Sequence, residues 1–199
     1  MKCTKPFQAL FAGLVFCYAA LISTSSVAAT ETYKFDMKGA HAFIQFKIPH
    51  LGYSMLLGEF TDFDGSFIYD TEAPEKSTVN VEIQTKSVHS NHGERDKHLR
   101  NKDFLNVDKH PVASFKSTKV TVNGDGKADV LGDFTLNGVT KPLVLKMNHI
   151  GAGKDPWGGY RRGFDGSVKF KLADFGIDYD LGPASKEVEI YVSIEGIRQ

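Results

Sequence analysis

Hydrophobic and polar residues alternate through residues 127–149, on both sides of Asn137-Gly138. An Asn-Gly step between two alternating runs is the strongest short-range signal for a β-hairpin, because both residues of a type I′ turn need positive φ. This turn sets Leu136 opposite Val139 and gathers the apolar side chains on one face. The polar face then gains two favourable cross-strand pairs, Asp129 with Lys146 and Thr135 with Thr140.

The same period of two recurs along most of the chain after residue 30. Further alternating runs cover residues 33–37, 42–48, 58–69, 79–85, 113–122, 164–171 and 187–194. Each run has one apolar face only, which excludes a parallel sheet covered by helices on both sides. The short connections predict eight or nine antiparallel strands in a sandwich or a barrel. Within the aromatic run, Asp64-Gly65 predicts a turn or a bulge.

Two segments interrupt this pattern. Residues 92–100 are typical of a short helix, with Asn91 as the N-cap and Glu94 three residues later, as in a capping box. Residues 149–163 are rich in glycine and contain the only tryptophan, Trp157, which indicates a long loop. Its aromatic side chains could close over an opening of the fold. A flexible connector with those rings resting on the outer wall is an equal alternative.

Residues 1–29 have the pattern of a secretory signal peptide. A basic start precedes an apolar run at residues 7–22, and Val27-Ala28-Ala29 is typical of a cleavage site. The apolar run is too short, and wrongly flanked, for a helix that spans a membrane. We therefore expect export, cleavage after Ala29, one domain of residues 30–199 and no stable membrane insertion.

Removal of this segment changes the composition of the chain. Both cysteines, Cys3 and Cys17, leave with it, so no disulfide can form within residues 30–199. Lys2 and Lys5 are the only charges lost, which leaves 22 basic residues against 24 acidic ones and a net charge of −2. Nucleic-acid-binding domains normally carry a clear basic excess, so this balance argues against a nucleic-acid partner.

Catalytic motifs are absent from the sequence. It contains no G-x-S-x-G, P-loop or H-E-x-x-H pattern, and residues 30–199 offer no cysteine nucleophile. The most concentrated candidate for chemistry is the group of His89, His92 and His98. On a helix these histidines and their acidic neighbours form pairs that point in different directions, whereas zinc needs three or four converging ligands. We interpret the segment as a solvated helix and expect no metal and no cofactor; a metal-binding or hydrolytic protein using this segment is the alternative hypothesis.

Several motifs occur in order along residues 30–199. They are His50-Leu51-Gly52, Phe60-Thr61-Asp62-Phe63-Asp64-Gly65, Asn91, Glu94-Arg95-Asp96-Lys97-His98-Leu99-Arg100, Asp103-Phe104, Phe115-Lys116-Ser117-Thr118, Leu136-Asn137-Gly138-Val139-Thr140-Lys141-Pro142, Asp155-Pro156-Trp157-Gly158-Gly159 and Glu187-Val188-Glu189-Ile190. In these motifs the chain resembles the YceI family of periplasmic, polyisoprenoid-binding proteins. The resemblance implies an all-β fold, an antiparallel eight-stranded lipocalin-like β-barrel with one short helix near residues 92–100. It also implies a periplasmic, non-enzymatic protein that carries or stores a polyisoprenoid lipid, of the quinone-precursor or prenyl-phosphate type.

Large apolar side chains at inward positions of such a barrel form the expected ligand-binding set. They are Ile44, Phe46, Phe60, Val81, Ile83, Val130, Phe134, Leu143, Leu145, Phe164, Val168, Phe170, Ile190 and Val192. Gly132 and Gly166 interrupt the set, and an inward glycine marks either close approach of a ligand or another backbone, or a bend of the sheet. We expect Gly132 to belong to the site, with Arg95, His98 and Trp157 at the openings and Arg95 facing an anionic or phenolic head group.

The alternation cannot separate a hollow barrel from a filled one, because any barrel core alternates in the same way. A structural barrel with a full interior is therefore a third hypothesis, next to the lipid-binding and metal-handling ones. In a hollow barrel, Gly132→Trp should occupy ligand space and leave the fold cooperative; in a filled one it should overpack the core. A homodimer is open as the oligomeric state.

Overall fold

The computed structural model describes Met1 and residues 30–199, so the expected signal peptide at residues 1–29 lies almost wholly outside the described residues. The described part contains eleven strands and one α-helix. The strands are β1 (Thr30–Phe35), β2 (Ala42–His50), β3 (Ser54–Phe60), β4 (Phe63–Asp70), β5 (Thr78–Gln84), β6 (Val88–His89), β7 (Val112–Gly124), β8 (Lys127–Leu136), β9 (Val139–Lys154), β10 (Tyr160–Lys171) and β11 (Glu187–Arg198), and the helix is α1 (Gly93–Arg100).

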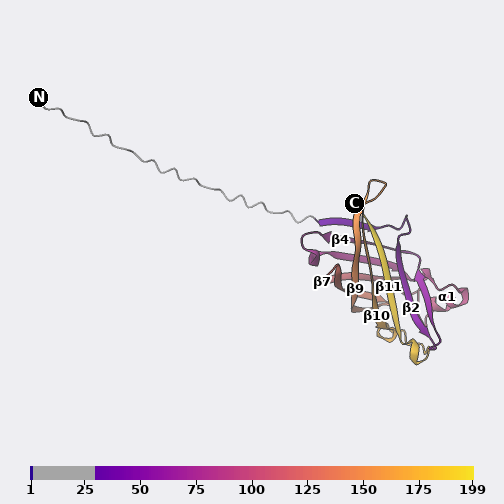
Figure 1. Ribbon diagram of the computed structural model, residues 1–199. Helices are drawn as coiled ribbons and strands as arrows, with labels where there is room; N and C mark the ends of the chain where they lie inside the picture. The colour runs from indigo at the N-terminus through magenta and orange to yellow at the C-terminus, as the bar shows by residue number, and fades with distance from the viewer. Residues whose placement is uncertain (2–29) are drawn as a thin grey trace.

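The strands form one closed antiparallel barrel (Figure 1). Three pairs of short strands, β1 with β2, β3 with β4 and β5 with β6, each act as one bent strand of the barrel. Eight strands then follow one another around the barrel in chain order. The last strand, β11, closes it by pairing with β2 at residues 189–194 and with β1 at residues 196–198. The expected eight-stranded antiparallel barrel is confirmed.

The bend between β3 and β4 falls at residues 61–62. Phe60 and Phe63 are both buried although they are three positions apart, because the strand turns a corner between them. The turn or bulge expected at Asp64-Gly65 is wrong, since both residues pair regularly with β5. A Cβ on Gly65 would collide with the ring of Phe35, so this glycine makes room for an aromatic side chain of the core.

The β8–β9 hairpin has the expected register. Asn137 and Gly138 have positive φ values of 50° and 76°, and Leu136 pairs with Val139. On the outer face, Lys146 Nζ lies 2.6 Å from Asp129 Oδ2, and the hydroxyl oxygens of Thr135 and Thr140 are 2.8 Å apart. The turn chemistry and the two faces therefore agree on one register.

Helix α1 begins one residue later than expected. Its N-cap is His92, whose Nδ1 accepts a hydrogen bond of 3.2 Å from the backbone N–H of Arg95. The expected cap at Asn91 is wrong, because Asn91 has φ of 62° and turns the chain before the helix starts. The helix follows β6, and its residues Arg95, His98 and Leu99 line the barrel interior.

The long loop expected at residues 149–163 is also wrong. Strand β9 runs to Lys154 and β10 begins at Tyr160, which leaves only residues 155–159 as a turn. The carboxylate of Asp155 holds this turn, since its Oδ1 accepts hydrogen bonds from the backbone N–H groups of Trp157 (3.0 Å) and Gly159 (2.7 Å). Glycine-rich strands have no side-chain alternation to reveal them, which is why the sequence pattern indicated a loop.

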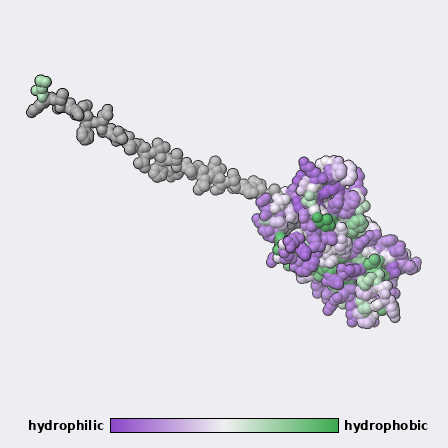
Figure 2. Space-filling view, in the orientation of Figure 1, coloured by the Kyte–Doolittle hydropathy of each residue, from purple (hydrophilic) through white to green (hydrophobic). Residues whose placement is uncertain are grey.

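The outer surface of the barrel is mainly hydrophilic in the view of Figure 2. Inward side chains of all the barrel strands meet in one apolar core, which includes Tyr33, Ile44, Ile83 and Phe175. Within the described residues, no helix has the length and apolar character needed to cross a membrane.

Candidate functional site

The barrel interior contains two adjoining chambers. Chamber 1 has a volume of about 390 Å³ and extends toward the β7–β8 hairpin and the start of β5. Chamber 2 has a volume of about 530 Å³ and is bounded by α1, the β2–β3 hairpin and the segment before β11. Ligand pockets usually measure about 300–1,000 Å³, so each chamber has the size of a binding site. The barrel is therefore hollow, and the filled-barrel hypothesis is wrong.

A ring of apolar side chains, which we call the waist, separates the chambers and lines both of them. Its members are Ile44, Ile83, Phe134, Phe170 and Ile190. The ring of Phe134 packs against those of Phe170 and Phe175, with centroid distances of 5.6 Å and 5.4 Å. A long apolar molecule that occupied both chambers would pass this waist.

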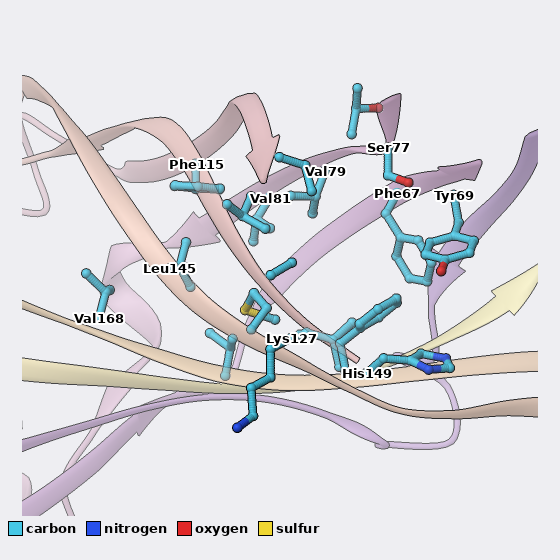
Figure 3. A pocket seen from close by; sticks show the side chains of 18 of the residues that line it. Phe67, Tyr69, Ser77, Val79, Val81, Phe115, Lys127, Leu145, His149 and Val168 are labelled. Carbon is cyan, nitrogen blue, oxygen red and sulfur yellow. The ribbon is translucent and has the colours of Figure 1, made fainter. Parts of the chain in front are cut away.

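The expected ligand-binding residues line these chambers, with two exceptions. Apart from the waist, chamber 1 is lined by Val81, Val130, Leu143, Leu145, Phe164, Val168 and Val192, and chamber 2 by Phe46, Phe60, Arg95 and His98. Figure 3 shows Val81, Leu145 and Val168 around chamber 1, each from a different strand. Period-two alternation places these side chains inside because successive residues of a strand point to opposite faces.

Gly132 is the first exception. It lines neither chamber, because the ring of Phe115 occupies the space that its side chain would take. A Cβ at this position would also lie 2.6 Å from the carbonyl oxygen of Lys116. The close approach at Gly132 is thus made by the protein's own core, and Gly132→Trp would displace Phe115 rather than only fill ligand space.

Trp157 is the second exception. Its side chain is 77% exposed at the tip of the β9–β10 turn, and it lines neither chamber. The guanidinium of Arg161 lies over its ring, 5.3 Å from the centroid. This turn is at the end of the barrel opposite α1, near the C-terminus (Figure 1). Of the two alternatives for this tryptophan, the structure shows the ring resting on the outside.

Two polar side chains of α1 reach chamber 2. Arg95 donates hydrogen bonds from Nε to Ser90 Oγ, at 2.7 Å, and from Nη2 to the carbonyl oxygen of Ser90. His98 packs edge-on against the rings of Phe104 and Tyr179, with centroid distances of 4.9 Å and 5.4 Å. Arg95 keeps donors that these bonds do not use, because a guanidinium carries five N–H groups.

A buried polar cluster at the far end of chamber 1 was not expected from the sequence. Arg162 is only 7% exposed, and its guanidinium lies 3.9 Å from the ring centroid of Tyr69. It donates hydrogen bonds to Tyr33 Oη (3.3 Å), Glu31 Oε2 (3.2 Å) and His149 Nε2 (3.2 Å). The alternating pattern gave no signal for it, because Arg162 lies in residues 149–163, which the sequence indicated as a loop.

Tyr69 and His149 from this cluster line the end of chamber 1 (Figure 3). Burial and the nearby charge of Arg162 lower the pKa of His149. A hydrogen bond with the backbone of Gly151 acts in the opposite direction and offsets part of this shift. Because Arg162 can only donate, Nε2 of His149 acts as the acceptor and the imidazole is neutral. On this side chamber 1 is bounded by the aromatic rings of Tyr69 and His149, with the charge of Arg162 behind them.

The histidine segment does not form a converging metal site in the described structure. The described residues contain one group of three metal-ligating side chains whose ligand atoms lie within 4.8 Å of one another, namely Asp36, His41 and Glu195. Arg161 already occupies this group, since its Nη1 donates to Asp36 Oδ2 at 2.6 Å and to Glu195 Oε1. Its donor set therefore fits an ion pair within the protein better than a metal ion.

Comparisons with known proteins agree with this architecture. The family model described as the YceI-like domain matches residues 33–196. A UPF0312 protein of Pseudomonas aeruginosa is 60% identical over 176 residues, which cover 88% of this chain and 92% of that protein. A UPF0312 protein of Azotobacter vinelandii is 56% identical over 181 residues, covering 91% of this chain and 94% of that one.

Solved structures show the same fold. The YceI protein of Campylobacter jejuni superposes with a TM-score of 0.70 at 28% identity, covering 77% of this chain and 91% of that one. A domain from Saccharophagus degradans, described as polyisoprenoid binding, has a TM-score of 0.63 at 15% identity and covers 84% and 98% of the two chains. The family model and the relatives, with the hollow barrel, support a binding protein, and this chain belongs to the YceI-like family.

Proposed function

We propose that this protein holds a long polyisoprenoid lipid, of the quinone-precursor or prenyl-phosphate type, for carriage or storage in the periplasm. The observation that carries the proposal is the pair of adjoining apolar chambers inside a closed barrel. The description of the Saccharophagus degradans domain as polyisoprenoid binding supports the choice of ligand. The basic and apolar segment at residues 1–29 supports export.

The chemistry of the chambers suits a hydrocarbon tail. A buried CH₂ group contributes about 0.8 kcal/mol and needs no polar partner, so a methyl-branched chain gains affinity with each unit that it buries. Long isoprenoids need more room than a compact ligand, and the two chambers meet at the waist. Phe134 and Ile190 would then contact the middle of the tail.

The polar end of the lipid fits best beside α1. Arg95 lines chamber 2 and has N–H groups that its bonds to Ser90 leave unused. A planar guanidinium suits phosphate or carboxylate oxygens, and His98 can add a second contact. At chamber 1, by contrast, Arg162 is committed to Tyr33, Glu31 and His149. We therefore orient the ligand with its head at chamber 2 and its tail toward chamber 1.

The test compares a wild-type protein with one whose chamber is filled. Val130→Trp places an indole in chamber 1, whereas Val144→Trp, on the outer face of the neighbouring strand β9, is the matched control. Purified proteins are mixed with all-trans prenyl alcohols of increasing length and examined by native mass spectrometry and thermal unfolding. We expect the wild type and the control to bind one prenol and gain stability, by about 2.7 kcal/mol at a hundredfold excess over Kd.

Val130→Trp should unfold cooperatively but lose the longer prenols. Prenol binding that is unaffected by Val130→Trp would place the ligand outside the barrel. Absence of any prenol adduct or stabilisation with the wild type would contradict the lipid proposal itself.

A further inference from the structure

The β2–β3 hairpin exposes a concentrated set of large apolar side chains, which we call the apolar tip. Its members and their exposed fractions are Leu51 (57%), Tyr53 (87%), Met55 (49%) and Leu57 (64%). The set follows from the strand alternation: Leu56 points into chamber 2, so its neighbours Met55 and Leu57 point outward. Figure 2 shows hydrophobic surface at the end of the molecule where this hairpin lies.

The apolar tip is continuous with the opening of chamber 2. Leu51 is exposed on the outside and also lines the chamber. Leu51 Cδ2 lies 3.7 Å from the position that a Cβ on Gly182 would take, so the tip touches the segment before β11. From that segment Tyr179, itself 48% exposed, packs its ring on His98 and Phe104. Apolar side chains thus extend from the outside of the barrel to the opening of chamber 2.

The shape of the tip restricts what can cover it. The chain turns back sharply at Leu51 and Gly52, with φ values of 52° and 81°, so the apolar side chains sit on a narrow projection. A stable protein–protein interface uses roughly 20–30 residues from each partner, many more than this tip offers. Small exposed apolar projections of this kind suit insertion between lipid head groups, where no complementary surface is needed.

We propose that the apolar tip docks this protein on a lipid bilayer, so that a prenyl chain passes between the membrane and chamber 2. The proposal rests on the lipid-binding function proposed above. Docking places the opening of the chamber against the acyl region, and the tail then enters the barrel without crossing water. Transfer of the exposed apolar side chains out of water into the bilayer is favourable for the same reason that burial of the ligand is.

The experiment uses vesicles of phosphatidylethanolamine and phosphatidylglycerol, with and without a prenyl alcohol. The test variant is Tyr53→Ser combined with Leu57→Ser. The control is Ile150→Ser, which removes a 67% exposed apolar side chain from β9, away from α1. Vesicle flotation measures docking, and the rate at which the protein extracts the prenol measures transfer.

We expect the double variant to lose vesicle binding and transfer rate by at least about tenfold, while Ile150→Ser behaves as the wild type. Binding of prenol from detergent micelles tests the proposed function separately from docking, because no bilayer is present. The double variant should bind that prenol as the wild type does, because its chambers are intact and its substituted residues are exposed. Failure of the wild type to bind prenol from micelles would contradict the proposed function and with it the transfer of a prenyl chain, whereas vesicle flotation tests docking by itself.

Three results would overturn the docking proposal. The first is flotation of the double variant to the same extent as the wild type, and the second is no flotation of the wild type. The third is a wild-type dimer, seen by light scattering, that the double variant lacks, because a second copy of the chain would then cover the tip.

Discussion

Glycines at inward positions of the barrel serve the packing of its own side chains. The ring of Phe115 takes the space beside Gly132, and Met147 takes the space beside Gly166. In each case a backbone carbonyl of the neighbouring strand also approaches closely. The sequence shows that a side chain is missing at these positions, but not which neighbour uses the room.

We expect Gly132→Ala to destabilise the protein by about 1–3 kcal/mol, because the added methyl group collides with Phe115 and with the backbone of β7. Urea unfolding measures this difference. Gly151→Ala is the control, since a Cβ on Gly151 meets nothing within 4 Å, and its effect should stay within about 0.5 kcal/mol. Equal changes in the free energy of unfolding for the two substitutions would contradict this prediction, because Phe115 and β7 would then have moved aside to accept the methyl group.

At the scale of elements, α1 is anchored by polar groups rather than by an apolar face. Its sequence, GERDKHLR, contains one apolar residue, Leu99. Asp96 is 5% exposed, and its Oδ1 accepts hydrogen bonds from the backbone N–H of Ser90, at 2.8 Å, and from its hydroxyl. Arg100 donates to the carbonyl oxygens of Lys86 and Val88, at 2.7 Å and 2.8 Å. These bonds hold the helix over chamber 2.

Asp96→Ala should loosen this helix, because it leaves the buried N–H of Ser90 without its partner. An unsatisfied buried donor costs about 1–3 kcal/mol, and we expect the free energy of local opening of α1 to fall by that amount. Hydrogen exchange of the α1 amides, read by mass spectrometry, measures the opening. Glu94→Ala removes an exposed carboxylate from the same helix and serves as the control. Equal exchange in both variants would mean that Asp96 does not anchor the helix.

At the scale of the whole molecule, a charged seam closes the barrel where β11 changes partner. Residues 36–41 bend the chain between β1 and β2, and Glu195 lies opposite this bend. Asp36 Oδ2 is 2.6 Å from Arg161 Nη1 on β10 and 2.8 Å from His41 Nδ1. Burial alone would raise the pKa of Asp36, but hydrogen bonds from Arg161, His41 and the backbone of Gly39 hold it at about 2.

This seam predicts a specific acid sensitivity. A carboxyl group whose pKa is depressed in the folded state stabilises that state above its unfolded pKa of about 3.9, and this contribution is lost as the pH falls toward the folded pKa. For Asp36 the loss should occur between about pH 4 and pH 2. We expect Asp36→Asn to lower the free energy of unfolding by about 1–2 kcal/mol at pH 7, after allowance for solvent screening.

The difference between wild type and Asp36→Asn should shrink as the pH approaches 2. Chemical unfolding at pH 7, 4 and 2 measures it. Asp129→Asn is the control, because Asp129 pairs with Lys146 on the outer face, and a surface pair contributes about 0–1 kcal/mol. A difference that stays constant from pH 7 to pH 2 would contradict the role given to the Asp36 carboxylate.

Local patterns in the sequence predicted most of the barrel and its lining. The Asn137-Gly138 turn set one register, and period-two alternation placed residues such as Val130 and Phe170 inside. Predictions from the sequence were wrong where adjacent residues do not alternate between apolar and polar side chains, or where a turn-forming residue pair lies inside a regular strand. It took the glycine-rich ends of β9 and β10 for a loop, and it placed the bend of the β3–β4 strand at Asp64-Gly65 instead of residues 61–62.

The sequence by itself determined most of the strands, their inward faces and the turn at Asn137-Gly138, because these depend on residues that are close together in the chain. Only the tertiary structure decided that the interior is hollow, that Phe115 fills the space at Gly132, and that Arg162 meets Glu31 and His149. Each of these features depends on side chains from distant strands, and strand alternation is the same in a filled barrel and an empty one. Closure of the sheet brings those strands together, and no local pattern records the volume that they leave between them.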